Sequence, residues 1–359
     1  MIKPAILLLF LLIASLLSVS GQTSVEREVA ARFAPVFYQA LGDHPRSDYI
    51  TNFDFDGDWR GDNNWDNADN KEFALRGYIY FAVSETRTHY FIHYAVFHPR
   101  DYKGGEEKGR VLSRIFQEGA KAVGANDPTG MLDEAVLAHE NDMEGCLVVV
   151  AKASKESGSE HVAYLESLHH NTFSDYMLGE STPQNFKTEG RRPVLYVEAK
   201  GHGIEAYTGD EKQTADREFL IYKYTGKADD PGKQKSGPVG YDLLAIKTTL
   251  WPKARIGTKA TGTTFGTAHD YSFISIDVMQ PNGKAVTQKI NVGGLGSAFL
   301  GNEGGVNMAR PPWGWFDNYH RSDPLGLWFF DPARIVRRDF NLGESFSTAY
   351  IKLPFWAVK

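Results

Sequence analysis

The chain has a single cysteine, Cys146, among 359 residues, so no disulfide can form within it. It also has no excess of basic residues, since 39 lysines and arginines against 45 aspartates and glutamates give a formal net charge of -6. This charge argues against a nucleic-acid-binding surface and provides no basic patch for a membrane. Stability must therefore come from a hydrophobic core, or from such a core together with a bound metal.

Long apolar runs are missing beyond the N-terminus. There, Lys3 precedes an apolar run over residues 5–17, and small residues follow up to Gly21. This order is typical of a secretory signal peptide over residues 1–21. The run is shorter than the roughly 20 residues that span a bilayer, although an uncleaved anchor stays open as the alternative. We expect a mature chain of about 338 residues that is secreted or periplasmic and has no transmembrane segment.

The common catalytic motifs are also missing. The sequence has no Gly-x-Ser-x-Gly nucleophile elbow, no phosphate-binding loop, no His-Glu-x-x-His helix and no paired-cysteine zinc motif. Glycine-rich stretches after residue 292 lack a following helix pattern, which argues against dinucleotide binding. Cys146 lies in an apolar strand pattern, so we expect a buried, inert thiol rather than a nucleophile.

Short strand patterns with many glycine turns dominate what is present. A capping box at Thr23 and Glu26 opens one short helix, and residues 107–123 have helical spacing. Strand patterns occur at residues 73–84, 88–97, 161–168, 193–200, 273–279 and 285–292. Pro99 is expected to end the second of these strands. The sequence predicts a mainly β protein, a β-sandwich with decorated loops, one or two helices and a β-rich C-terminal extension.

The organisation into domains follows from one loop-like stretch. Residues 227–237 are rich in Lys, Asp, Pro, Gly and Ser, which is typical of a boundary. We therefore expect a sandwich core over residues 22–226 and a C-terminal extension over residues 227–359 packed on it.

The most informative stretch runs from His139 to Glu144 and opens the apolar strand at residues 146–150. Strand alternation places Asp142 and Glu144 on one face, and His139 can join them only if the chain bends. With Asp101, they supply three carboxylates and one imidazole, which suit Ca²⁺, Mg²⁺ or Mn²⁺ better than structural zinc. A cation would also remove the repulsion among these carboxylates. The alternative is a set of solvated acidic groups at strand ends.

Two segments resemble the necrosis- and ethylene-inducing (NPP1-like) secreted proteins. Residues 92–101, Ile-His-Tyr-Ala-Val-Phe-His-Pro-Arg-Asp, resemble the strand of that family that runs into a Pro-Lys-Asp element. Residues 138–144, Ala-His-Glu-Asn-Asp-Met-Glu, resemble its heptapeptide Gly-His-Arg-His-Asp-Trp-Glu and keep the His-x-x-Asp-x-Glu skeleton. A vacuolar-sorting-protein-62-like group has a similar element. The resemblance covers residues 73–207.

The resemblance implies a β-sandwich and a divalent cation bound by Asp101, His139, Asp142 and Glu144, with His202 nearby. It also implies a protein that recognises a glycan or a lipid headgroup in a cytolysin-like way. Three residues depart from the heptapeptide, because Ala138, Asn141 and Met143 replace its glycine, second histidine and tryptophan. The disulfide cysteines of many members are absent. The plant-membrane toxicity of that family is a further property that the resemblance implies.

Three functional hypotheses remain. The favoured one is a cation-dependent binding protein whose ion leaves coordination positions for a glycan or lipid headgroup. The second is a metal-assisted hydrolase acting on a glycosidic or phosphoester bond, with Glu140 or His202 as the general base. In the third, the ion only stabilises the fold. The sequence does not predict the oligomeric state.

An acidic loop between residues 52 and 66 is a second candidate cation site. Its aspartates echo a calcium loop, but Trp59 and Trp65 stand where an EF-hand needs glycine and glutamate. A looser calcium loop and a set of Asx turns both remain open, and the two tryptophans suit either a carbohydrate-binding face or a cap on the core. The candidate ligands are Asp54, Asp56, Asp58 and Asp62.

Other histidines and tryptophans have structural explanations. His169 and His170 are adjacent in a strand pattern, so their side chains are expected on opposite sides, at the surface. His93 is expected to line the core. Trp313 and Trp315 are expected to form a rigid aromatic clasp that closes the core, with sugar stacking as the alternative.

Overall fold

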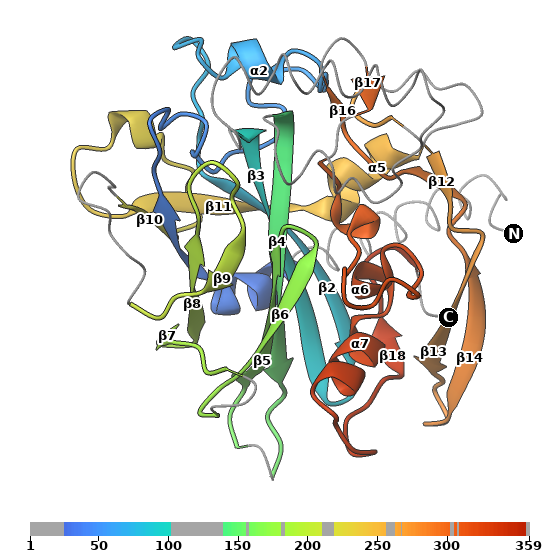
Figure 1. Ribbon diagram of the computed structural model, residues 1–359. Helices are drawn as coiled ribbons and strands as arrows, with labels where there is room; N and C mark the ends of the chain where they lie inside the picture. Colours follow the sequence, from blue (N-terminus) through green and yellow to red (C-terminus); the bar gives the residue numbers. More distant parts are fainter. Residues whose placement is uncertain are drawn as a thin grey trace, which may run out of the picture.

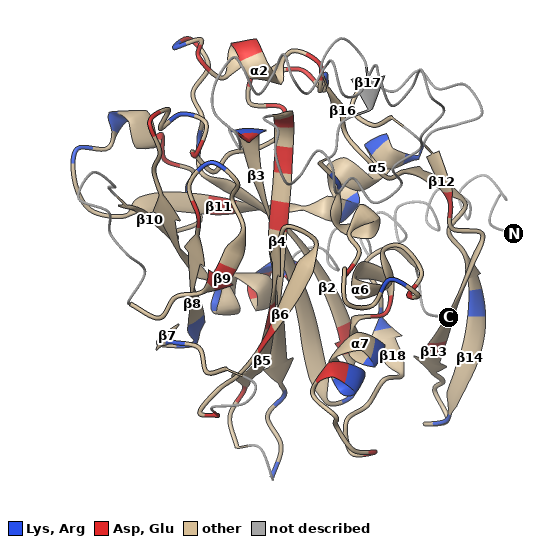
Figure 2. Cartoon of the chain, in the orientation of Figure 1, with Lys and Arg blue, Asp and Glu red and all other residues tan. Residues whose placement is uncertain are grey.

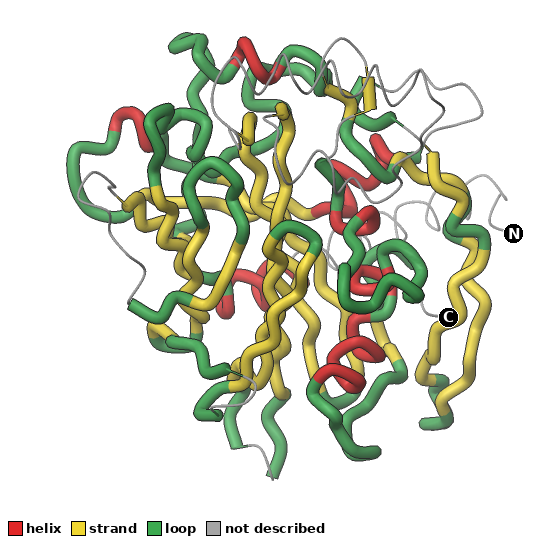
Figure 3. Tube along the Cα trace, viewed as in Figure 1, coloured by secondary structure: helices red, strands yellow, loops and turns green. Residues whose placement is uncertain are grey.

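The computed structural model describes residues 25–101, 139–155, 158–180, 184–209, 219–255, 263–266, 268–301, 305–306 and 309–356. The expected signal peptide and the helical pattern at residues 107–123 lie outside these ranges. Strands form most of the regular structure, and short helices lie around them (Figure 3). This confirms the mainly β class, although the short helices exceed the one or two expected. Within the described ranges, no helix combines the length and apolar character needed to cross a membrane.

One large mixed sheet organises the molecule (Figure 1). Its strands follow the order β6-β5-β4-β3-β2-β11-β10-β1-β8-β7, and β9, β13, β14 and β18 attach to this path. The strands of the path are β1 (Val36–Ala40), β2 (Tyr78–Thr86), β3 (His89–Asp101), β4 (His139–Ala151), β5 (His161–His169), β6 (Thr172–Met177), β7 (Thr188–Glu189), β8 (Arg192–Val197), β10 (Phe219–Tyr224) and β11 (Val239–Ala245).

The remaining elements lie at the edges and on both faces of this sheet. The strands are β9 (Ile204–Ala206), β12 (Ala268–Asp270), β13 (Phe273–Met279), β14 (Ala285–Asn291), β15 (Gly294–Gly296), β16 (Leu300–Gly301), β17 (Gly305–Val306) and β18 (Tyr350–Lys352). The helices are residues 25–33, α2 (Asn64–Asn67), α5 (Leu250–Ala254), α6 (Leu327–Phe330) and α7 (Pro332–Asp339), with 3-10 turns at Pro231–Lys233, Ile246–Thr248 and Pro312–Gly314.

The sheet has a hydrophobic core on each face. Along β4, Val148 belongs to one core, whereas Leu147 and Val149 belong to the other, as the alternation of a strand requires. The first core also contains residues of β1, β8 and β10, so these strands face β2, β3 and β4 in a sandwich. The second core lies between β2–β4 and the C-terminal elements α6, α7 and the β13–β14 hairpin (Figure 1). Strand β4 is therefore buried on both faces.

The expected hairpin of residues 73–97 is present as β2 and β3, but one detail was wrong. Pro99 does not end the strand, because β3 continues to Asp101 and pairs with the first residue of β4. Pairs on either side of the proline, His98 with Asp142 and Arg100 with Glu140, keep the register. Pro99 has no backbone N–H to donate, and the long hydrogen-bonded ladder between β3 and β4 tolerates the loss of this one donor.

Residues beyond 227 contribute to the main sheet. Strand β11 lies between β10 and β2 in the sheet order, and β18 pairs with β2 near its end. The expected boundary near residue 227 stays a prediction, and hydrogen-bonded strands come from both sides of it.

Candidate cation site

The residues expected to bind a cation lie where β3 ends and β4 begins. The antiparallel register places Asp101 opposite His139, and 3.6 Å separate Asp101 Oδ2 from His139 Nε2. Acidic residues follow one another along this end of β4 (Figure 2). All four candidates, Asp101, His139, Asp142 and Glu144, line one cavity of about 20 Å³. A cavity of this size holds one water molecule or one ion.

Asn141 lies in β4 between His139 and Asp142, where the register with β3 stays continuous. It has a φ of 62°, in the left-handed region that asparagine adopts more readily than most residues. Its side-chain amide donates to the carbonyl oxygens of Gly61 and Leu300, at 2.6 Å each. Its oxygen accepts a hydrogen bond of 2.6 Å from Asn64. The acidic loop, α2 and β16 thus all hold this position of β4.

His202 braces Asp142 from a separate turn. The ring is fully buried, its Nδ1 donates to Asp142 at 2.8 Å, and its Nε2 donates to Asp48 at 3.1 Å. Burial disfavours the charged ring, but the two carboxylates outweigh it and raise the pKa of His202 to about 10. The same pairing lowers the pKa of Asp142, although burial opposes it. At neutral pH, a buried imidazolium therefore joins two carboxylates and fixes the position of Asp142.

His98 is a neutral partner in the same cluster. Its ring stacks on that of His202 with 3.7 Å between centroids, and its Nε2 donates to Gln39 at 2.8 Å. Burial, and then the charge of His202, hold the pKa of His98 well below its ordinary value. Ligand atoms of His98, Asp142 and His202 lie within 4.8 Å of one another. Both nitrogens of His202 face carboxylates in this arrangement, so a metal ion could bind this ring only by displacing one of these hydrogen bonds.

Basic groups also reach the cavity and compete with a cation. Arg310 and His170 line it together with the carboxylates. The guanidinium of Arg310 lies 5.1 Å from the centre of the Phe316 ring, and His170 Nδ1 lies 3.7 Å from Glu144 Oε1. A bound ion would share this space with the positive charge of Arg310. The affinity for the ion therefore depends on how many of the three carboxylates contact the ion and how many contact Arg310.

Both candidate general bases are already hydrogen-bonded within the protein. Glu140 is buried and its Oε2 accepts a hydrogen bond of 2.9 Å from the backbone N–H of Trp65, at the start of α2. It does not line the described cavity. Both ring nitrogens of His202 face carboxylates, those of Asp142 and Asp48. Both residues position parts of the chain around the cavity, and their role as general bases stays a prediction.

The acidic loop uses its aspartates for local hydrogen bonds. Asp56 accepts from the backbone N–H of Asp58 at 3.1 Å, and Asp58 accepts from that of Arg60 at 2.7 Å, as in Asx turns. Asp54 accepts from Asn52 at 2.9 Å, and Asp62 pairs with Arg60 at 3.0 Å. A second calcium site at Asp54, Asp56, Asp58 and Asp62 stays a prediction.

The two tryptophans of this loop contact the protein itself. Trp59 packs on Phe53 with 5.7 Å between ring centres, and Arg100 lies 5.4 Å from the ring centre of Trp65. Trp65 is buried. These contacts favour the role of a cap on the core.

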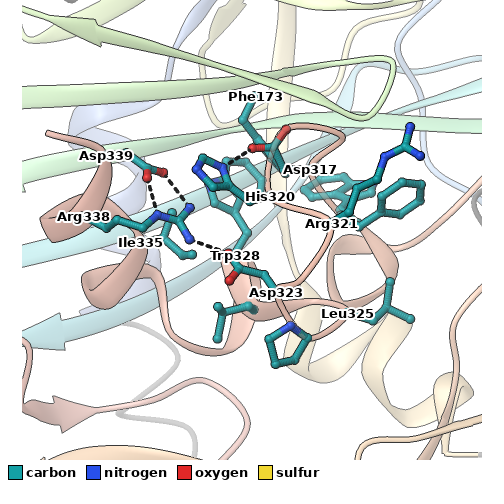
Figure 4. Close-up of a pocket in the computed structure, with 14 residues that line it drawn as sticks. Phe173, Asp317, His320, Arg321, Asp323, Leu325, Trp328, Ile335, Arg338 and Asp339 are labelled. Atoms are coloured by element: carbon teal, nitrogen blue, oxygen red, sulfur yellow. Dashed lines mark hydrogen bonds and ion pairs between the residues drawn. The ribbon is translucent and has the colours of Figure 1, made fainter.

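A second cavity, of about 200 Å³, lies beside α7 (Figure 4). Charged groups lining it are paired with one another, since Arg338 contacts Asp323 and Asp339, and His320 Nδ1 lies 2.7 Å from Asp317. Its wall includes Trp315 and Trp328, which are almost fully buried. The pairing leaves the charges of this cavity largely balanced.

The aromatic clasp is confirmed. Trp313 and Trp315 are buried in the second core, and their indole N–H groups donate to the carbonyls of Gly296 at 2.7 Å and Met143 at 3.1 Å. His93 also lines the core as expected, with Nε2 donating to the carbonyl of Trp328 at 2.9 Å. Neither tryptophan presents a face for a sugar.

The expectation for His169 and His170 was wrong. His169 ends β5, but His170 lies in the turn that follows, so strand alternation does not apply to the pair. Both rings contact Glu198. Sequence reasoning also missed Asp48, which lies in a loop segment with no local motif.

No protein-family model and no curated protein matches this chain. Similar solved structures include the NLPPya protein in complex with glucosamine, at 12% identity over 61% of this chain and 72% of that one, with a TM-score of 0.30. A structure described as a toxin fold for microbial attack and plant defense matches at 11% identity over 49% of this chain and 53% of that one, with a TM-score of 0.23. Necrosis and ethylene inducing protein 2 from the causal agent of cocoa's witches' broom disease matches at 10% identity over 48% of this chain and 51% of that one, also with a TM-score of 0.23.

This chain thus spans about half the length of two of these proteins. The family that the sequence resembles is represented among the similar structures, and the resemblance to the vacuolar-sorting-protein-62-like group stays a prediction. Identities and TM-scores this low establish no shared activity. We therefore argue function from the side chains of this chain.

Proposed function

We propose that this protein is a secreted binding protein that depends on a divalent cation, held by Asp101, His139, Asp142 and Glu144. The observation that supports this proposal is that four potential ligands from two strands line one cavity of about 20 Å³. Three carboxylates in so small a space repel one another, and a divalent ion would offset that repulsion. A donor set of mostly oxygen atoms suits Ca²⁺, Mg²⁺ or Mn²⁺.

The surrounding groups would fix the ligands in place. Asp142 is oriented by protonated His202, which is itself bonded to Asp48. Asn141 fixes the backbone between His139 and Asp142. Such supporting contacts commonly change metal affinity by 10- to 100-fold.

The ligand we propose is a glycan or a lipid headgroup. Four protein groups do not fill the six to eight positions around Ca²⁺, so hydroxyl oxygens of a ligand can complete the coordination. Glucosamine and mannosamine, which two NLPPya structures hold, are suitable first probes. A cytolysin-like action on membranes would follow from headgroup recognition.

A metal-assisted hydrolase is the second candidate, and the positions of its two proposed bases argue against it. Glu140 bonds to a backbone amide and His202 is already protonated. The cation as a stabiliser alone is the third candidate. It predicts metal binding without any sugar or headgroup affinity.

Calorimetric titration of the chain lacking residues 1–21 with Ca²⁺, Mg²⁺ and Mn²⁺ tests the cation site. We expect a binding event that the double variant Asp142→Asn/Glu144→Gln abolishes. Asp101→Asn, which does not alter the partner of His202, should weaken it at least 10-fold. The control Asp54→Asn/Asp58→Asn should leave it unchanged. Circular dichroism checks that each variant is folded.

Two outcomes would contradict the proposal. One is the absence of binding by the wild type at millimolar cation, and the other is binding that only the control variant removes. If the cation binds, titration of glucosamine, mannosamine and headgroup-bearing vesicles with and without it distinguishes a binding protein from a merely stabilised one.

A further inference from the structure

Two histidines and two glutamates form a separate cluster beside the cation cavity. Register pairs His169 with Thr172, which leaves His170 and Asn171 as a two-residue hairpin turn between β5 and β6. Both turn residues are left-handed, with φ values of 50° and 57°, as in a type I′ turn. The turn brings the two rings to 4.4 Å between centres. The chain therefore presents two imidazoles together, which strand geometry alone would not do.

Both imidazoles converge on one carboxylate. His170 Nε2 lies 2.6 Å from Glu198 Oε1, and His169 Nε2 lies 3.5 Å from Glu198 Oε2. The three ligand atoms lie within 4.8 Å of one another. In a zinc site with bonds of about 2.1 Å, ligand atoms lie about 3.4 Å apart, so adjustments of about 1 Å would bring these atoms into coordination.

The second nitrogen of each ring faces another carboxylate. His169 Nδ1 lies 2.9 Å from Glu205 Oε1, and His170 Nδ1 lies 3.7 Å from Glu144 Oε1. A metal-bound histidine commonly bonds through its other nitrogen to a carboxylate, which fixes its tautomer and orientation. The ring of His169 has that arrangement, whereas His170 Nδ1 faces Glu144 at a distance longer than a hydrogen bond.

The backbone also fixes the ring of His169. A side chain at Gly203 would place its Cβ 2.2 Å from His169 Cδ2, so the ring packs directly on that glycine. Gly203 directly follows His202, which is hydrogen-bonded to Asp142. One turn therefore positions both a residue of the cation cavity and the ring of His169.

Charge in the cluster favours a cation. Three carboxylates, Glu144, Glu198 and Glu205, surround the two rings. A divalent ion bound between the rings would offset the repulsion among these carboxylates.

We propose that His169, His170 and Glu198 form a second metal site, which binds Zn²⁺ or a similar transition-metal ion. Two imidazole nitrogens with one carboxylate suit zinc, in contrast to the oxygen-rich cavity at Asp101 and Asp142. The side chains are 30%, 23% and 30% exposed, so an ion reaches them from solvent and water completes the coordination. The three ligands of this site differ from the four proposed for the cation cavity, although His170 also lines that cavity beside Glu144.

Titration with ZnCl₂ after removal of bound metal by a chelator tests this site. We expect His169→Asn and Glu198→Gln to weaken Zn²⁺ binding at least 10-fold. His161→Asn, at the other end of β5, and Asp101→Asn, in the cavity, should change it less than twofold. Co²⁺ in place of Zn²⁺ provides a second readout, because its visible absorption reports nitrogen and oxygen coordination and should disappear in His169→Asn.

Three results would overturn the proposal. They are the absence of Zn²⁺ binding by the wild type at millimolar metal, binding that His169→Asn and Glu198→Gln leave intact, and binding that Asp101→Asn abolishes. The last result would assign the zinc to the cavity. Matching circular dichroism and melting temperatures for His169→Asn and His161→Asn exclude unfolding as the cause.

Discussion

At the scale of single residues, neighbours decide the charge of three buried histidines. His202 contacts two carboxylates and is protonated, whereas His98 stacks on that charged ring and is neutral. His93 lies in the second core beside the rings of Trp328 and Phe329, where burial lowers its pKa to about 4. The same side chain is therefore a charged brace in one place and a neutral core residue in another.

The neutral state of His93 predicts a pH dependence of stability. Its pKa is about 4 in the folded chain and about 6.5 when unfolded, so between these values only the unfolded chain binds the proton. The contribution of neutral His93 to the free energy of unfolding is fully present above pH 6.5 and is lost as the pH falls toward 4. The free energy of unfolding falls by about 3 kcal/mol over this range.

Urea unfolding at pH 7.5 and pH 4.5 measures this effect in the wild type and in His93→Gln. The glutamine can still donate to the carbonyl of Trp328 but does not titrate. We expect the variant to lose less stability between the two pH values than the wild type does. Equal losses would show that His93 does not titrate in this range.

At the scale of elements, β4 combines a long buried strand with one left-handed residue. The register with β3 stays continuous from His139 to Ala151, although Asn141 has a positive φ. The amide of Asn141 joins β4 to the loop at Gly61 and to β16 at Leu300. The ligand end of β4 is thus held by segments distant in sequence.

Replacement of Asn141 separates its backbone role from its hydrogen bonds. Asn141→Gly keeps the left-handed conformation but removes the amide, and we expect a loss of about 2 kcal/mol in unfolding free energy. Asn141→Ala also adds left-handed strain, which costs about 1 kcal/mol more. Thermal or urea unfolding checks that the wild type is the most stable, the glycine variant less stable and the alanine variant the least stable. An alanine variant as stable as the glycine variant would contradict the strain.

At the scale of the whole molecule, two cores enclose the central strands. Cys146 is fully buried in the core shared with β1, β8 and β10, and burial raises the pKa of its thiol. The expectation of a buried thiol is therefore confirmed. Exposure of this side chain requires β4 to separate from its neighbours.

Thiol reactivity should therefore report opening of the whole fold. We expect one thiol per chain to react with a disulfide reagent in urea and almost none to react in the native state within minutes. The native rate should fall further when a saturating cation stabilises the fold, by about 100-fold at 100 times the dissociation constant. Rapid native reaction would show that β4 opens locally.

Several features of this protein were determined by the sequence alone. The alternation of apolar residues identified the β2–β3 hairpin and placed β13 at residues 273–279, because periodicity is a local property. The same alternation put Asp142 and Glu144 on one side of β4, and their ligand chemistry together with the resemblance joined Asp101 and His139 to them. The four residues line one cavity in the structure. Trp313 and Trp315 were identified as a core clasp from their local Pro- and Gly-rich context.

Only the tertiary structure decided which distant groups meet. Asp48 contacts His202 across 154 positions of sequence, and β11 enters the sheet between β10 and β2. His169 and His170 share Glu198 because a turn, rather than a strand, holds the second ring. Such contacts depend on how the sheet folds and packs, whereas the sequence pattern specifies only which face of each strand is apolar.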